Sequence, residues 1–261
     1  MRNRVIPVVD LFAGPGGLGE GFSALNDGKA FQIIVSAEKD PIARETLRLR
    51  AFYRMLKTQM PDKLDDYYAY CRGESEFPFT NKTQRIWDAA SKEALCIELG
   101  TDEGNHILDQ AIQRGLSDFE KDQPWVLIGG PPCQAYSLAG RSRNKGISDY
   151  SAENDKRNFL YKEYLRIINS YKPAMFVMEN VKGMLSAKVN GVQIFHEILQ
   201  DLASPDRAFP EGTEHSRYVV LNSHRERDIA PVVGLTTFYG HYYVIIHLVF
   251  ELALGRIQIA A

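Results

Sequence analysis

The stretch Val5-Ile6-Pro7-Val8-Val9-Asp10-Leu11-Phe12-Ala13-Gly14-Pro15-Gly16-Gly17 decides the fold. It begins as a short apolar run of the kind that forms a buried strand, and the glycines end that run. Leu18, Phe22 and Leu25 then recur at helical spacing. The stretch therefore predicts a strand, a glycine turn and a helix. Such a turn brings backbone amide groups and a helix N-terminus close to a polar ligand.

The same pattern of strand and helix follows directly. Residues 31–37 have the composition of a second strand, which ends at Glu38. Pro41 is then placed at the first turn of a helix that continues through Leu49. A carboxylate directly after the second strand is thereby predicted to lie beside the glycine turn.

Two further strands of the buried type are predicted at residues 125–128 and 175–178. Strands that alternate with helices indicate an α/β, Rossmann-like fold, a mainly parallel sheet with helices on both faces. In such a fold, functional residues gather where the strands end. The helix between these two strands has an apolar face that comprises Leu160, Tyr164, Ile167 and Ile168.

The bulk composition of the 261 residues is that of an ordinary globular protein, with 44% hydrophobic residues, 25% charged residues and a formal net charge of -2. Three cysteines without paired spacing, and no apolar segment after Met1, favour a reducing cytoplasm. No apolar run reaches the roughly 18 residues of a membrane span. We therefore expect a cytoplasmic protein whose contacts with nucleic acid, if it has any, come from local basic clusters.

The glycine turn alone leaves two classes of enzyme open. Gly14-x-Gly16-x-x-Gly19, with Glu38 about 20 residues downstream to bind ribose hydroxyls, fits a nicotinamide or flavin enzyme. It fits an enzyme that uses S-adenosylmethionine equally well.

The segment Gly130-Pro131-Pro132-Cys133-Gln134 separates these classes. Two prolines at the end of a buried strand fix the backbone direction, so the following thiol is aimed away from the sheet edge. That position suits an activated nucleophile better than a packed side chain. Burial as a small hydrophobic residue, the usual fate of a free cysteine, is expected instead for Cys71 and Cys96.

Four motifs in order resemble those of the cytosine C5-methyltransferase family. They are residues 10–17, residues 131–134 with Ser137, residues 157–160, and residues 179–181 with Gly183. The resemblance covers residues 5 to 225, although residues 52–124 are only weakly constrained. It implies the S-adenosylmethionine-dependent methyltransferase version of the Rossmann-like fold.

The resemblance also implies a mechanism. The thiolate of Cys133 adds to C6 of cytosine and makes C5 nucleophilic. That carbon takes a methyl group from S-adenosylmethionine, which leaves S-adenosylhomocysteine as the product. A carboxyl group at Glu179 supports the addition from N3 and helps to select cytosine. Arg225 is the third catalytic candidate.

The cofactor contacts that the resemblance implies begin at the glycine turn. Phe12 would lie against the adenine ring, unless it packs in the core, and Glu38 would accept from the ribose. For the adenine amino group the sequence leaves Glu98 and Asp102 as alternatives. The complete set of expected cofactor residues is Phe12, Ala13, Gly14, Gly16, Gly17, Leu18, Glu38, Pro132, Asn158 and Leu160.

Double-stranded DNA with a flipped cytosine is the implied substrate. The base must leave the helix stack before Cys133 can reach C6, at a cost of roughly a few kcal/mol that phosphate contacts offset. Residues 137–146, which are polar, glycine-containing and basic, suit a lid over the phosphate backbone. The expected substrate-binding residues are Ser137, Arg141, Arg143 and Asn180.

The C-terminal part departs from the family pattern. Its Gln-x-Arg-x-Arg motif is represented only by Ser223-His224-Arg225-Glu226-Arg227. We therefore expect a catalytic domain at residues 1–228 with an insertion at 52–85, an atypical tail at 229–261, and no target-recognition domain. A truncated enzyme or a second chain that supplies recognition would explain this. The histidines of residues 238–243 lack a cysteine or carboxylate at ligand spacing, and we expect no metal site.

Three other functions stay open at this stage. The same fold could methylate cytosine in RNA, or the chain could be an inactive remnant that binds only cofactor or DNA. A nicotinamide oxidoreductase explains the glycine turn but gives no role to Cys133 or Glu179.

Overall fold

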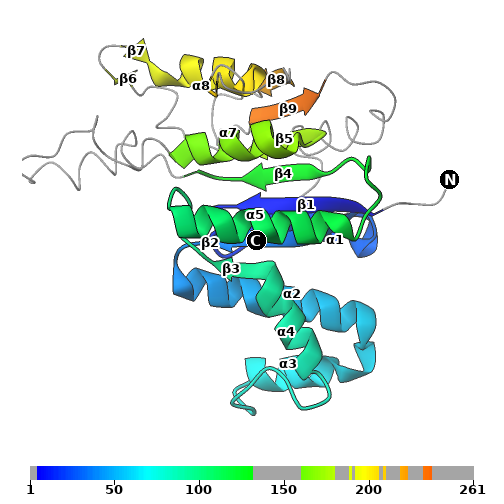
Figure 1. Cartoon of the computed structure of the whole chain (residues 1–261). Helices are drawn as coiled ribbons and strands as arrows, with labels where there is room; N and C mark the ends of the chain where they lie inside the picture. Colours follow the sequence, from blue (N-terminus) through cyan, green and yellow to red (C-terminus); the bar gives the residue numbers. More distant parts are fainter. Residues whose placement is uncertain are drawn as a thin grey trace, which may run out of the picture. The chain divides into compact units, whose positions relative to one another are not determined.

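The computed structural model describes residues 5–131, 160–179, 188–189, 192–205, 208–209, 218–222 and 232–236 (Figure 1). The chain divides into two compact units, Met1–Gln123 and Pro124–Ala261. Each unit is described by itself.

The first unit contains three parallel strands, β1 (Ile6–Leu11), β2 (Phe31–Glu38) and β3 (Ala94–Cys96), in the order β3-β2-β1. Apolar side chains make β1 and β2 the centre of the core, where Val8 and Val9 are fully buried. The carboxyl ends of the three strands lie at the same edge, because parallel strands share one direction. The predicted strands at 5–12 and 31–37 are confirmed with shifts of one residue.

Helices pack on these strands as the alternation predicted. A Cβ atom at Gly19 of α1 would lie 2.8 Å from the Asp10 side chain of β1, and one at Gly115 of α5 would lie 3.1 Å from the Ile34 side chain of β2. The absence of a side chain at these glycines therefore lets α1 lie close to β1 and α5 close to β2. The helical elements of this unit are α1 (Gly17–Gly28), α2 (Pro41–Gln59), η1 (Pro61–Lys63), α3 (Leu64–Cys71), α4 (Gln84–Glu93) and α5 (Asp102–Ser117).

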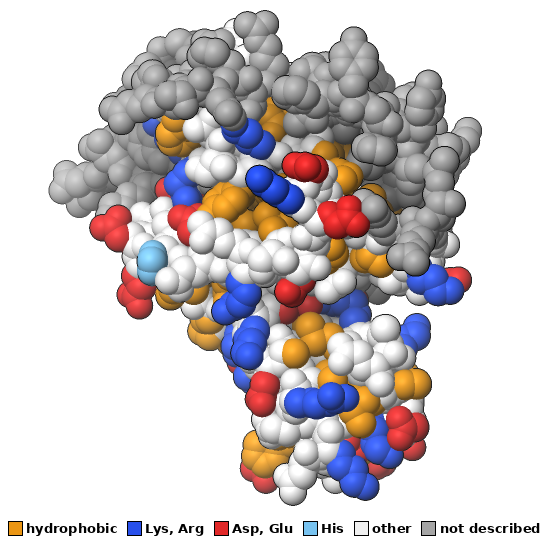
Figure 2. Space-filling model, turned by 45° about the vertical axis from the view of Figure 1, so that its right-hand side comes forward, with side chains coloured by type: hydrophobic (Ala, Val, Ile, Leu, Met, Phe, Trp, Pro, Cys, Tyr) orange, Lys and Arg blue, Asp and Glu red, His pale blue; other side chains and the backbone are white. Residues whose placement is uncertain are grey.

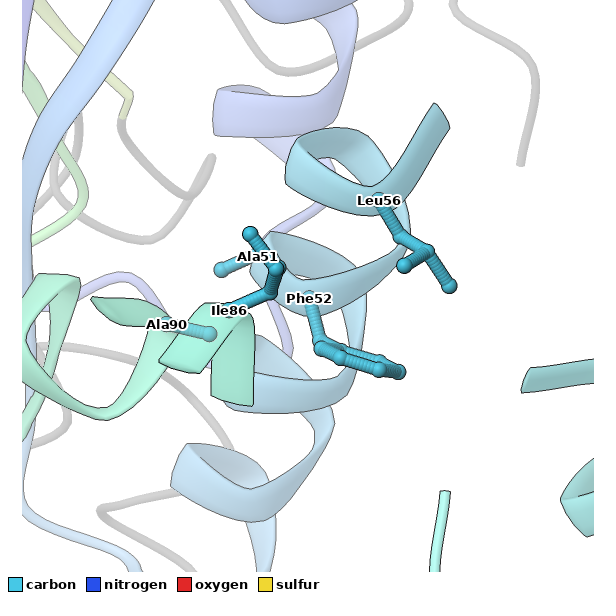
Figure 3. Close-up of a cluster of buried hydrophobic side chains, with 5 residues drawn as sticks. All are labelled: Ala51, Phe52, Leu56, Ile86 and Ala90. Atoms are coloured by element: carbon cyan, nitrogen blue, oxygen red, sulfur yellow. The ribbon is translucent and has the colours of Figure 1, made fainter. Parts of the chain in front are cut away.

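The helix that begins at Pro41 is longer than the sequence pattern indicated. The pattern loosens after Leu49, but α2 continues to Gln59, and Phe52 and Leu56 are fully buried. The range 52–85, which the sequence predicts as an insertion, therefore begins with core residues of α2. Figure 3 shows the small core that α2 and α4 build together from Ala51, Phe52, Leu56, Ile86 and Ala90.

A charge network ties α1, α2 and α4 together. Arg54 of α2 pairs with Glu20 of α1 and, at 2.5 Å, with Glu93 of α4. Burial raises the pKa of the Glu93 carboxyl to about 7, against the opposing effect of Arg54. The buried carboxyl thus depends on one arginine for its charged form.

The second unit contains two parallel strands, β4 (Val126–Gly129) and β5 (Met175–Met178), joined in sequence by a segment that includes α7 (Leu160–Tyr171). Their predicted positions are confirmed. Two antiparallel strands continue this part of the sheet in the order β4-β5-β9-β8. The remaining elements are β6 (Lys188–Val189), β7 (Val192–Gln193), α8 (Ile194–Ala203), β8 (Tyr218–Asn222) and β9 (Val232–Thr236).

Tyr164 of α7 holds β4 and β5 together from within the core. It is fully buried, and its hydroxyl lies 3.2 Å from the carbonyl oxygen of Leu127 and 2.9 Å from that of Val177. The predicted apolar face of this helix is confirmed for Tyr164, Ile167 and Ile168, which are all buried. These two hydrogen bonds therefore hold β4 and β5 together near their carboxyl ends.

The expected fold class, a Rossmann-like methyltransferase fold with a mainly parallel sheet, is confirmed by these strand pairs and their helices. Among the described residues, no helix is long and apolar enough to span a membrane. Figure 2 shows acidic and basic side chains interspersed on the described surface that it faces, in keeping with the small net charge.

Candidate active site

The glycine turn after β1 has an unusual backbone. Phe12, Gly14 and Gly16 have φ angles of 55°, 56° and 91°, all in the left-handed region. This region is uncommon for a bulky residue such as Phe12, so the surrounding structure must hold it there. The amide of Ala13 still donates to the carbonyl oxygen of Ala37 at 3.1 Å. The turn is thereby fastened to the end of β2.

The glycines of the turn serve two purposes. A Cβ atom at Gly16 would lie 2.6 Å from the Leu47 side chain, so this glycine lets α1 and α2 approach each other. A Cβ atom at Gly14 or Gly17 would meet nothing within 4 Å among the described residues. Open space therefore borders the backbone at Gly14 and Gly17. Gly16 also caps α1 without a side-chain hydrogen bond, which leaves the first amides of the helix for another acceptor.

Glu38, the last residue of β2, is fixed against this turn. Its Oε2 accepts a hydrogen bond from the Gly14 amide at 2.8 Å. Its Oε1 accepts from the amides of Lys39 and Asp40 at 2.8 and 2.7 Å. A carboxylate can accept about four hydrogen bonds, so Glu38 retains capacity for a ligand hydroxyl.

The end of β3 adds a second carboxylate to this edge of the first unit. The Ile97 amide donates to the Glu38 carbonyl oxygen at 2.9 Å, and Glu98 pairs with Lys39 at 2.5 Å. Asp102 is instead the first residue of α5 and follows Thr101, whose side chain caps the helix. Of the two alternatives from the sequence, the structure links Glu98 to the residues around Glu38.

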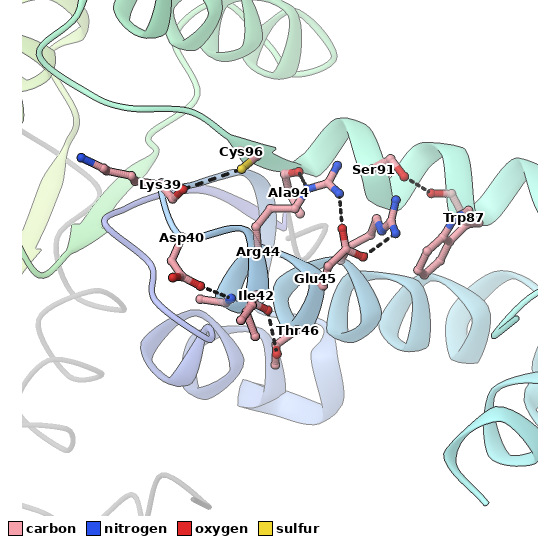
Figure 4. Close-up of polar contacts among 12 residues, drawn as sticks. Lys39, Asp40, Ile42, Arg44, Glu45, Thr46, Trp87, Ser91, Ala94 and Cys96 are labelled. Carbon is pink, nitrogen blue, oxygen red and sulfur yellow. Dashed lines mark hydrogen bonds and ion pairs between the residues drawn. The ribbon is translucent and has the colours of Figure 1, made fainter. Parts of the chain in front are cut away.

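Figure 4 shows polar contacts at the start of α2, which begins three residues after Glu38 in the sequence. Asp40 caps the helix by accepting from the Ala43 amide at 2.8 Å, and the Arg44 side chain donates to the Ala94 carbonyl oxygen at 3.0 Å. The Cys96 thiol donates to the Lys39 carbonyl oxygen at 3.8 Å. These contacts tie the ends of β2 and β3 to α2.

Cys71 and Cys96 are both exposed. The expectation that they are buried as small hydrophobic residues is therefore wrong. Cys71 ends the short α3, which has no buried residue, and Cys96 ends the outermost strand of its unit.

In the second unit, Glu179 directly follows β5. Its amide donates to the Gly129 carbonyl oxygen at 2.8 Å, which extends the pairing with β4 by one residue. Its side chain is exposed, and Oε2 lies toward Gly130. The carboxylate is therefore presented at the strand end from which Pro131-Pro132-Cys133 follows in the sequence.

A family model described as C-5 cytosine-specific DNA methylase matches residues 73–206, about half of the chain. This chain belongs to the family of C-5 cytosine-specific DNA methylases. The match includes Cys133, Leu160 and Glu179, and the described strands β4 and β5 lie within it.

Individual relatives of this chain agree with the family match. The type II methyltransferase M.Bpa9945I of Bacillus paralicheniformis is 34% identical over 245 residues, covering 88% of this chain and 50% of that protein. M.AquIA of Picosynechococcus is 31% identical over 179 residues, covering 69% of this chain and 50% of that protein. The chain thus spans about half the length of these curated relatives.

Among solved structures, a protein described as a DNA modification methyltransferase encoded within a prophage of E. coli is 20% identical to this chain. The superposition has a TM-score of 0.43 and covers 88% of this chain and 47% of that one.

Several predicted site residues lie outside the described part of the chain. Of the others, Leu160 begins α7, and the residues from Phe12 to Leu18, with Glu38, gather at one edge of the first unit. The described residues contain no group of three His, Cys, Asp or Glu side chains that could hold a metal ion. The residues outside the description are Pro132, Cys133, Ser137, Arg141, Arg143, Asn158, Asn180 and Arg225.

Two residues at the candidate site are not among those that the sequence predicts. Lys39, which pairs with Glu98, follows Glu38 directly, and its position next to a strand end was the available signal. Gly130 was read only as part of the turn before Cys133, although it lies against Glu179. No sequence pattern shows that contact, because the two residues are 49 positions apart in the sequence.

Proposed function

We propose that this chain carries the methyl-transfer machinery of an S-adenosylmethionine-dependent DNA (cytosine-5-)-methyltransferase of a type II restriction-modification system. The observation that supports it most is the position of Glu179 at the end of β5, paired to the strand end that leads into Pro131-Pro132-Cys133. Family membership and the names of the type II relatives favour DNA over RNA as substrate.

The residues around the glycine turn fit an adenosine-containing cofactor. Glu38 would bind the ribose hydroxyls with its remaining acceptor capacity, and Phe12 would lie against the adenine ring. Glu98 would accept from the adenine amino group once its pairing with Lys39 loosens. When bound, S-adenosylmethionine supplies an electrophilic methyl group. The open space beside Gly14 and Gly17 lets the backbone come close to it.

Cys133 and Glu179 would carry the chemistry at the base. The Cys133 thiolate forms a covalent bond to C6 of cytosine, and the electron pair of the C5–C6 double bond becomes available at C5. The carboxyl group of Glu179, at N3, donates a proton or a hydrogen bond to this nitrogen and so offsets the negative charge that the addition develops there. After the methyl group has joined C5, loss of the C5 proton and of the thiolate restores the aromatic ring. Arg225 is the proposed third catalytic residue.

Positioning of DNA would come from the segment after Cys133. Arg141 and Arg143 would contact phosphates, while Ser137 and Asn180 would support the flipped cytosine and the nucleophile loop. Pro132, Asn158 and Leu160 would complete the cofactor side. This chain matches about half of each of these relatives. We propose that readout of the bases comes from sequence that corresponds to the other half, or from a second chain. We also propose that the enzyme is cytoplasmic.

Cofactor binding tests this proposal directly. Isothermal calorimetry should show that S-adenosylmethionine or S-adenosylhomocysteine binds the purified chain, and that NAD does not. Glu38→Ala should weaken this binding at least about tenfold, since an acceptor for the ribose is lost. Glu103→Ala removes an exposed glutamate of α5 and serves as the matched control. Tight NAD binding without binding of S-adenosylhomocysteine would overturn the assignment.

A further inference from the structure

Gly130, the first residue after β4, lies against Glu179. A Cβ atom built on it would be 3.0 Å from Oε2 of Glu179, 3.8 Å from its Cβ and 3.9 Å from its carbonyl oxygen. These are the three nearest atoms among the described residues, and all belong to Glu179. The space that a side chain at position 130 would need is therefore the space that the Glu179 carboxylate uses.

The glycine is not needed for its backbone conformation. The φ angles in the left-handed region belong to other glycines, such as Gly14 and Gly16, and not to Gly130. An alanine could therefore adopt the same backbone without strain. What the glycine provides at this position is room.

The backbone of Glu179 cannot move away to make that room. Its amide donates to the Gly129 carbonyl oxygen at 2.8 Å, and the preceding residue, Met178, is paired with Gly129 in the parallel ladder. Tyr164 fixes the same two strands two residues earlier, through the carbonyl oxygens of Leu127 and Val177. A methyl group at position 130 would thus displace only the carboxylate, the free end of a flexible side chain.

We propose that Gly130 is a positioning residue that sets where the Glu179 carboxylate lies across the end of β4. The proposal rests on the function proposed above, in which Glu179 acts on N3 of the flipped cytosine. A group that handles charge at a reacting base has to be held within about 0.5 Å, and a misplacement of about 1 Å can lower the rate roughly 100-fold. A methyl group at position 130 that displaces the carboxylate by about 0.5 Å would therefore lower the rate about tenfold, while it costs little stability.

The test compares Gly130→Ala and Gly130→Val in the complete enzyme. This term means the chain together with the further sequence or the second chain that supplies target recognition. Single-turnover transfer of tritiated methyl groups to DNA should slow about tenfold for Gly130→Ala and further for Gly130→Val. The dissociation constant for S-adenosylhomocysteine and the melting temperature of Gly130→Ala should stay close to those of the parent. Gly115→Ala, which places a Cβ atom 3.1 Å from the Ile34 side chain, is the control for an added methyl group at a tight glycine. It should leave the transfer rate unchanged.

A double-mutant comparison separates positioning from general damage. In the Glu179→Gln background, the side chain has already lost its charge, so adding Gly130→Ala should change the rate less than about twofold. A tenfold further loss in that background would contradict the proposal. If Gly130→Ala transfers methyl groups at the wild-type rate while Glu179→Gln is slow, the positioning role of Gly130 is wrong and the role of Glu179 stands. Full activity of Glu179→Gln would overturn the role assigned to Glu179 and the inference with it.

Discussion

Cys133→Ser should abolish methyl transfer to DNA and leave S-adenosylhomocysteine binding nearly unchanged. A serine hydroxyl is scarcely ionised at neutral pH and is a far weaker nucleophile than a thiolate, so addition to C6 should not proceed. Cofactor binding should persist, because the thiol acts on the base and does not hold the cofactor. The complete enzyme, assayed with tritiated S-adenosylmethionine and by calorimetry, provides both measurements.

A DNA duplex that contains 5-fluorocytosine makes this prediction sharper. Fluorine at C5 cannot leave as the proton does, so the enzyme should stay covalently linked to the DNA and survive denaturation. The linked peptide should contain Cys133. Cys71→Ser is the matched control, since Cys71 is an exposed cysteine on α3, and it should form the adduct normally. An adduct that persists in Cys133→Ser, or that is lost in Cys71→Ser, would refute the assignment of the nucleophile.

Glu93 should make the stability of the chain depend on pH. Burial raises the pKa of Glu93 in the folded state from 4.5 to about 7, so the folded protein binds this proton more tightly than the unfolded chain does. The resulting contribution to stability is complete below about pH 4.5 and is lost as the pH rises through about 7. The size of the shift corresponds to roughly 3 kcal/mol in the free energy of unfolding.

Glu93→Gln isolates this contribution from that of the other carboxyl groups. The amide keeps the shape of the side chain and an acceptor for Arg54, but it does not titrate. Urea unfolding at pH 5 and at pH 8 should show that the variant gains stability relative to the parent by roughly 3 kcal/mol between these values. Glu103→Gln, at an exposed position of α5, should follow the parent at both pH values. Parallel behaviour of Glu93→Gln and the parent would show that Glu93 is ionised without penalty in the fold.

The sequence predicted the centre of the sheet and the glycine turn well, for a physical reason. A strand buried on both faces is mainly apolar, and a sharp turn needs glycine, so residues 5–17 carry a clear local signal. The same reasoning placed Glu38 at the end of its strand. The structure confirms that position and adds its hydrogen bond to Gly14, which sequence alone does not specify.

Properties that depend on distant contacts were less predictable. The second half of α2 is buried because α4 packs on it. The polar residues that separate the two helices in the sequence give no indication of this packing. Strand β9 lies within the range that was expected to be an atypical tail, and it pairs antiparallel with β5 although no alternation marks it. Its short, nearly uncharged pattern fits a buried strand and a buried helix equally well. The division into domains and the roles of all the proposed site residues stay predictions.

The identity of the methylated nucleoside tests the central claim most directly. The complete enzyme is incubated with tritiated S-adenosylmethionine and, in parallel, with duplex DNA and with RNA of matched sequence, and the products are digested to nucleosides and separated. The function proposed for this chain predicts that the label appears in DNA as 5-methyldeoxycytidine. Label in N4-methyldeoxycytidine, in N6-methyldeoxyadenosine or only in RNA would contradict it.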